Sequence, residues 1–263
     1  MGWARVVRAA RHRVGAYRRL GGAVLLAGTV LLAGCTGEST PPAAPPSSTP
    51  THEPVDARDQ LAALAAAAQD RHLVVVYTLR TEGRPDRAVT VTLAGDGSWR
   101  VDIPGGVLGG DGDVSIAENA SGRYQCSLPS PYYPEPPTCV RVSGPGQPLP
   151  AEIDPRLQHL FTDWPEVLTD RRAPLAVSAA RLAGAQGSCF SVESTATSVA
   201  PPMDAGIYCY APDGTLTAAR LPAGTLALAG TPTAAPATIA LPGPVVQREP
   251  LPVAAPHSDA EPN

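Results

Sequence analysis

The sequence predicts an α+β domain in which an antiparallel sheet carries helices on one face. Residues 56–69 are rich in alanine and place their larger apolar side chains on one face of a helix. Residues 89–103 instead alternate between apolar and polar side chains, which is typical of strands with one buried face. The order helix, strands, helix, strands favours a sheet with helices packed against it.

The first β block covers residues 73–103. Leu73 to Leu79 contains three consecutive valines, so we expect a strand that is covered on both faces. Two alternating runs follow, and the segment between them, residues 95–98, contains the Asp-Gly pair that favours a hairpin turn.

A second helix is expected at residues 154–168. Asp154 suits the N-cap, Pro155 suits the first helical position, and Pro165 should kink or restart the helix. A second β block follows, punctuated by glycine and proline, with strands expected at residues 175–182, 189–193, 206–211, 215–221, 225–229 and 238–241.

The first 34 residues have the features of an export signal. Six arginines and no acid precede an apolar run of about 13 residues, which is too short to span a bilayer. Leu32-Ala33-Gly34-Cys35 resembles the bacterial lipobox, in which the cysteine receives a diacylglycerol and further acyl chains such as palmitate. We therefore expect Cys35 to be the lipid anchor of a mature chain on the extracytoplasmic face of the cell membrane. An ordinary signal with a chance cysteine is the alternative, and Arg18-Arg19 leaves the twin-arginine route open.

The amino-acid composition of the rest of the chain indicates three parts, namely a tether, a domain and a tail. Residues 35–54 hold the lipidated cysteine and a Pro/Ser/Thr-rich segment, for which we expect a disordered tether. Residues 55–242 make one domain of ordinary size, and residues 243–263 have the composition of a disordered tail.

The charge of the mature chain argues against nucleic acid as a partner. After removal of the signal, 14 arginines face 24 acids, which gives a net charge of −10. Nucleic acid binding rests on basic contacts to phosphate, and the chain has no basic stripe. The expected partners are the membrane, through the anchor, and a lipid or acylated ligand.

Four cysteines remain in the exported domain, where disulfides persist. Three pairings are possible, and proximity in sequence favours Cys126–Cys139 and Cys189–Cys209. A zinc site would need close pairs of ligands that these spacings lack, so we expect no metal.

The chain also resembles a known family of lipoprotein carriers. The order of its elements is similar to that of LolA-like carriers, including LppX/LprG-type lipoproteins. That order is a first helix, the strands VVVYTLRT and VTVTLAGDGSWRVDIP, a middle helix and a last meander with YCYAPDGTLTAARL. The resemblance covers residues 56–242 and rests on element order and the G-D-G-x-W-R-V-D pattern, so no family site residue is carried over. It implies a curved antiparallel half-barrel with helices packed on its concave face and a cavity for acyl chains.

No catalytic constellation is found, and we expect neither enzymatic activity nor a cofactor. The sequence lacks nucleophile-elbow, zincin, P-loop and dinucleotide motifs, and the histidines are scattered. Asp111-Gly-Asp113 begins like a calcium loop but lacks the glycine and closing glutamate such loops need.

Two functions therefore remain. In the first, an apolar cavity holds a lipid or lipidated ligand, and its candidate lining residues are Trp99, Val101, Ile103, Phe161 and Trp164. In the second, the same residues form a closed core, and the domain is a non-catalytic binding or sensing module. The two differ in the space beneath the helices, because a ligand cavity needs several hundred cubic ångströms.

Overall fold

The computed structural model describes residues 56–196 and 201–255. The chain divides into two compact units, residues 1–51 and 52–263, and every described residue belongs to the second. The expected signal, Cys35 and the whole expected tether lie outside the described residues.

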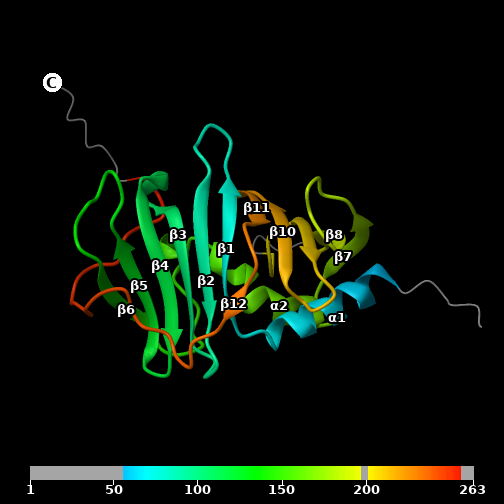
Figure 1. Cartoon of the computed structure of the whole chain (residues 1–263), viewed down its shortest axis with the longest axis horizontal. Coiled ribbons are helices and arrows are strands. Elements are labelled where there is room, and N and C mark those ends of the chain that lie inside the picture. The colour runs from blue at the N-terminus through cyan, green and yellow to red at the C-terminus, as the bar shows by residue number, and fades with distance from the viewer. Residues whose placement is uncertain (1–55, 197–200, 256–263) are drawn as a thin grey trace, which may run out of the picture. The chain divides into compact units, whose positions relative to one another are not determined.

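Twelve antiparallel strands form one open sheet (Figure 1). The central strand β1 pairs with β2 on one side and with β11 on the other. From β1 a meander leads to the edge strand β6, and a second meander returns from the other edge, β7, to β11. The strands are β1 (Leu73–Arg80), β2 (Arg87–Leu93), β3 (Trp99–Val107), β4 (Gly112–Asn119), β5 (Gly122–Leu128), β6 (Thr138–Ser143), β7 (Leu175–Ala180), β8 (Ser188–Ser194), β9 (Gly206–Tyr210), β10 (Leu216–Leu221), β11 (Gly224–Leu228) and β12 (Thr233–Ala234).

The expected α+β fold, a half-barrel with helices on its concave face, is wrong because the chain is predominantly β. Among the described residues there are two α-helices, α1 (Ala57–Gln69) and α2 (Asp163–Thr169), against twelve strands. The sequence pattern missed β4, β5 and β6 because polar side chains such as Ser115 and Gln125 are buried in them and hide the alternation. No strand forms at residues 238–241.

Helix α1 forms where its alanine-rich sequence predicts it. The Asp56 side chain caps its start by accepting a hydrogen bond from the Arg58 N–H at 3.1 Å. Leu61 and Ala65 are fully buried, and the helix packs against α2 and β7.

The connection between β6 and β7 holds two short 3₁₀ turns and one short α-helix rather than one long helix. It consists of η2 (Ala151–Ile153), η3 (Leu157–Leu160) and the seven-residue α2. Asp154 follows η2 instead of capping a helix. Pro165 is the third residue of α2, where the missing N–H has no intrahelical partner to lose, so the helix restarts close to the residue at which a break was expected.

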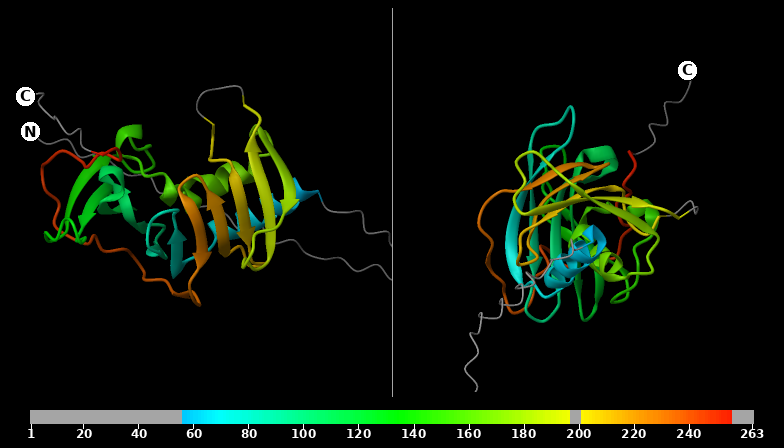
Figure 2. Two further views of the ribbon diagram at one scale, coloured as in Figure 1. Left: turned by 90° about the horizontal axis from the view of Figure 1, so that it is seen from above. Right: turned by 90° about the vertical axis from the view of Figure 1, so that its right-hand side faces the viewer.

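One large apolar cluster joins the helical segments to both halves of the sheet. Its members include Leu61 of α1, Val91 and Val101 of the first meander, and Tyr208 and Leu226 of the second. Figure 2 shows the two meanders continuing into one another through β1 and β11. The Tyr77 hydroxyl of β1 adds a buried polar link across this junction by donating to the Leu216 carbonyl at 2.9 Å.

Residues 243–255, called the C-terminal strap below, are hydrogen-bonded to the first meander. Val246 N–H donates to the Cys139 carbonyl at 2.8 Å, and Cys139 N–H donates to the Pro244 carbonyl at 2.9 Å. Farther on, Leu108 N–H donates to the Pro252 carbonyl. The strap therefore covers the β6 edge, whereas the sequence analysis placed the domain boundary at residue 242.

Candidate functional site

The predicted lining residues of β3 lie inside the apolar cluster. Trp99, Val101 and Ile103 alternate along the strand and are 8%, 0% and 3% exposed. Their side chains share one face, as their spacing predicts.

The two predicted lining residues of the middle segment pack onto tyrosines of the sheet. The Phe161 ring lies 5.2 Å from the Tyr77 ring, measured between centroids. Trp164, which is 3% exposed, meets the Tyr208 ring edge-on at 6.3 Å. All five predicted residues thus belong to the cluster or pack against it.

Little space is left where Phe161 packs against Tyr77 and β10. A cavity of about 30 Å³ lies beside Phe161 and is bounded by β1, β10 and the helical segments, with lining residues that include Leu73, Val75, Tyr77, Leu160 and Leu216. That volume suits about one water molecule, whereas ligand pockets usually measure about 300–1,000 Å³. Two buried polar atoms at this cavity, Arg71 Nε and Thr215 Oγ1, have no hydrogen-bond partner, so a water molecule fits its chemistry.

A carboxylate–imidazole–carboxylate cluster fixes the turn before α2. His159 Nε2 lies 2.8 Å from Asp154 Oδ2, and its Nδ1 is hydrogen-bonded to Asp163. Burial disfavours the imidazolium, but the hydrogen bonds and charges of both carboxylates outweigh it and raise the pKa of His159 to about 9. The same contacts hold the pKa of Asp163 below its usual range.

Arg123 connects this cluster to the sheet. Its side chain is 4% exposed, donates to Glu118 at 2.7 Å and lies 3.8 Å from an Asp163 oxygen. The guanidinium also lies over the Trp99 ring, 5.3 Å from the centroid. This network was not predicted from the sequence, although the four-residue spacing of His159 and Asp163 was a usable signal.

The two disulfides are those that the sequence analysis favoured. Cys126 pairs with Cys139 across β5 and β6, and Cys189 pairs with Cys209 across β8 and β9. In each pair the cysteines face one another in the strand register, with Cα atoms 3.9 Å and 4.0 Å apart. Each bond therefore fixes the register of a hairpin.

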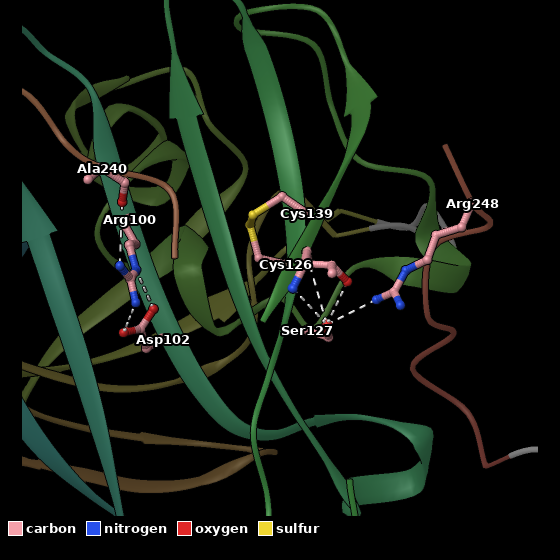
Figure 3. The surroundings of a disulfide bond; sticks show 8 residues. Arg100, Asp102, Cys126, Ser127, Cys139, Ala240 and Arg248 are labelled. Carbon is pink, nitrogen blue, oxygen red and sulfur yellow. Dashed lines mark hydrogen bonds and ion pairs between the residues drawn. A yellow bond between two sulfur atoms is a disulfide. The ribbon is translucent and has the colours of Figure 1, made fainter. Parts of the chain in front are cut away.

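A surface pocket with a volume of about 550 Å³ lies next to the Cys126–Cys139 bond. Its apolar walls are Leu108 of the 3₁₀ turn η1 (Leu108–Gly110) between β3 and β4, Leu128 of β5 and Leu251 of the strap. Figure 3 shows Arg248 of the strap reaching back to Ser127, whose Oγ accepts a hydrogen bond at 3.0 Å. The strap thus supplies one side of this pocket.

A second pocket of about 330 Å³ opens where the β3–β4 turn meets η3. Its floor includes Ile103, one of the predicted lining residues, and Leu157, while Arg84 and Arg87 stand at its edge. A third pocket, of about 330 Å³ and mostly polar, lies between Trp99, Phe161 and the Arg123 network. Val101 and Trp164 line none of these pockets.

Within residues 56–196 and 201–255, no group of three or more His, Cys, Asp or Glu side chains is arranged to hold a metal ion. Asp113, from the segment that begins like a calcium loop, lies in β4 and accepts a hydrogen bond from Gly105 N–H at 2.7 Å. Among the helices of the same residues, none is long and apolar enough to cross a membrane.

No protein-family model matches this chain, and no curated protein matches it at a significant level.

Proposed function

We propose that the chain is an exported lipoprotein whose domain is a non-catalytic binding module with a filled core. In this proposal Cys35 carries the acyl chains, and the tether holds the domain outside the cell membrane. The ligand or partner is bound at the surface of the domain, and the interface between the helices and the sheet holds none.

One observation favours the binding module over the carrier suggested by the resemblance to LolA-like proteins. The apolar space between Phe161, Tyr77 and β10 is about 30 Å³, the larger pocket that Phe161 shares with Trp99 is mostly polar, and the five residues expected to line a cavity pack in or against one apolar cluster. A chain of a dozen methylenes needs roughly the several hundred cubic ångströms of an ordinary ligand pocket. The surface pockets of 330 Å³ and 550 Å³ have that size.

The core half of this proposal is tested by lipid extraction. Residues 36–263 are exported behind a conventional signal peptide, purified without detergent and unfolded in organic solvent. The expected result is no acyl lipid that is released only when the domain unfolds. A lipid bound one to one, and retained by variants of every surface pocket, would show that the core holds a ligand.

The anchor half is tested by fractionation. Cys35→Ala removes the acyl acceptor, so the exported chain is expected to leave the membrane fraction for the soluble one. Cys35→Ala chains that are cleaved at the same place and still sediment with membranes would contradict the anchor. Acyl labelling with radioactive palmitate provides the matching positive readout in the unsubstituted chain.

A further inference from the structure

Two arginines at the β3–β4 turn share one hydrogen-bond acceptor. Arg84 Nη1 donates to the Gly110 carbonyl at 2.7 Å, and Arg87 Nη1 donates to the same oxygen at 3.1 Å. Arg84 also donates through Nη2 to the Gly109 carbonyl at 2.8 Å. The two guanidinium groups are therefore neighbours, and like charges at this separation repel one another.

Glycines make room for both guanidinium groups. A Cβ atom at Gly110 would lie 2.1 Å from Arg84 Nη1, and one at Gly105 would lie 1.7 Å from Arg87 Nη1. Only residues without a side chain allow the arginines to lie this close to the turn. The positions of the two cations are thus built into the local sequence.

No carboxylate of the described residues forms an ion pair with either arginine. The ion pairs of this part of the chain use the cationic side chains of Arg71, Arg80, Arg100, Arg123, Arg156, His159 and Arg171. Two acids of the neighbouring segments have other partners, since Asp86 pairs with Arg80 and Asp113 accepts from Gly105 N–H. The two neighbouring guanidinium groups therefore lie side by side without a counter-ion among the described residues.

The pocket beside these arginines has an apolar floor. It measures about 330 Å³, and no acidic side chain lines it. The apolar lining side chains are Leu79, Ile103, Pro104, Pro155, Leu157, Ala223 and Val253. The lining of the pocket therefore combines two charged donors with apolar side chains.

We propose that this pocket binds an amphiphile with an anionic head, either a phosphate or a carboxylate. Each guanidinium has five N–H donors, of which two are used on Arg84 and one on Arg87, so several remain for the oxygens of the head group. The apolar part of the ligand lies on Ile103 and Leu157. This assignment rests on the proposed function, because it names the ligand class of the binding module.

The test measures calorimetric binding of decyl phosphate, below its micelle concentration, to residues 36–263. One saturable site is expected, with inorganic phosphate and the uncharged decyl maltoside each binding at least tenfold more weakly. Vesicles of phosphatidylglycerol form a further arm, with phosphatidylcholine as the reference. If the domain binds the phosphatidylglycerol vesicles and not the phosphatidylcholine vesicles, the head group belongs to a lipid in a bilayer. If it binds neither kind of vesicle, the head group belongs to a dispersed amphiphile.

The variant Arg84→Gln/Arg87→Gln is expected to weaken decyl phosphate binding at least tenfold, because charge-assisted hydrogen bonds are lost. Arg220→Gln is the matched control, since Arg220 is exposed on β10 and lies outside the pocket lining. It should change the affinity less than twofold. Thermal unfolding of both variants verifies that they are folded.

Equal affinity of the double variant and the control would overturn the anionic site, as would inorganic phosphate binding as tightly as decyl phosphate. Neither result contradicts the proposal that the core is filled. A co-purifying lipid that is lost from the double variant supports the site and leaves the proposed function intact. A lipid that the double variant retains until it unfolds contradicts the proposed function instead.

Discussion

His159 and Asp154, five residues apart, are joined by a 2.8 Å hydrogen bond between Nε2 and Oδ2, while Asp163 occupies the other ring nitrogen. The charged imidazole thereby ties the turn after η2 to the first turn of α2. Burial alone would raise the pKa of Asp154, but hydrogen bonds from His159 and Gln158 hold it below its usual range. The ionic contacts of this cluster therefore help to hold α2 in its position.

The stability of the domain should depend on the pH through this cluster. The pKa of His159 is about 9 in the fold against 6.5 as its ordinary value, so its contribution is complete below about pH 6.5 and is lost as the pH rises through 9. Asp154 and Asp163 have lowered pKa values, so their contribution is lost as the pH falls below about 4. Urea unfolding across this range should therefore show a maximum between about pH 4 and 6.5.

The variant His159→Gln separates this effect from the rest of the chain. It should lower the free energy of unfolding by about 3 kcal/mol at pH 6, since the pKa is raised from 6.5 to about 9 and a pKa unit corresponds to about 1.4 kcal/mol. The difference between variant and parent should shrink above pH 9. A constant difference from pH 6 to pH 10 would contradict the charged state of His159.

Each disulfide should contribute about 3 kcal/mol to stability, because the closed loops span 13 and 20 residues. The comparison is between Cys126→Ala/Cys139→Ala and Cys189→Ala/Cys209→Ala, with peptide mapping under non-reducing conditions to verify the remaining bond. Peptides that link Cys126 to Cys189 or Cys209 would contradict the pairing. Unchanged urea midpoints in both variants would contradict the loop-entropy contribution.

The C-terminal strap depends on Gln125, a side chain that is 2% exposed. Its Oε1 accepts from Leu251 N–H at 2.6 Å, and its Nε2 donates to the Leu251 carbonyl at 2.9 Å. The variant Gln125→Ala should release the strap, at a cost of about 1–3 kcal/mol for the lost hydrogen bonds. Faster hydrogen exchange at residues 244–253 is the expected readout, and the exposed Gln147→Ala is the control. Unchanged exchange there would show that the strap is held by other contacts.

A filled core predicts a large effect of truncating Trp164, which is 3% exposed. Trp164→Ala should lower the free energy of unfolding by about 3–5 kcal/mol, because the removed ring leaves a cavity. Tyr132→Ala, at a side chain that is 72% exposed, is the control and should change it by less than about 0.5 kcal/mol. A small effect at Trp164 would mean that its ring faces empty space.

The parts of the fold that follow one local signal were predictable from the sequence. Helix α1, the hairpin at Asp96-Gly97 and both disulfides follow from alanine content, an Asp-Gly turn and cysteine proximity. The structure of the middle segment was not predictable from the sequence. Asp154 is hydrogen-bonded to His159 rather than to a helix N-terminus, and only the tertiary structure shows this. The strap was missed for a similar reason, since its proline-rich sequence is held by Gln125 and Cys139 rather than by its own propensity.

The candidate pocket lay beyond local patterns. Arg84 and Arg87 are brought to Gly109 and Gly110 by the pairing of β2 with β3 and of β3 with β4, more than twenty residues along the chain. Ile103 was predicted as a lining residue by its alternation with Asp102, but that pattern is the same for a core and for a pocket floor. The distinction depends on volume, which a sequence does not contain.

The most direct test of the filled core is photo-crosslinking with a fatty acid that carries a diazirine at its methyl end. Residues 36–263 are irradiated with this probe, and the labelled positions are located by fragment mass spectrometry. If the core is filled, Leu73, Val75 and Leu216, which surround the 30 Å³ cavity, carry no label. The label is then found on surface-pocket residues such as Leu79 and Leu157. Saturable labelling of Leu73, Val75 or Leu216 would contradict the filled core and would make the domain a carrier.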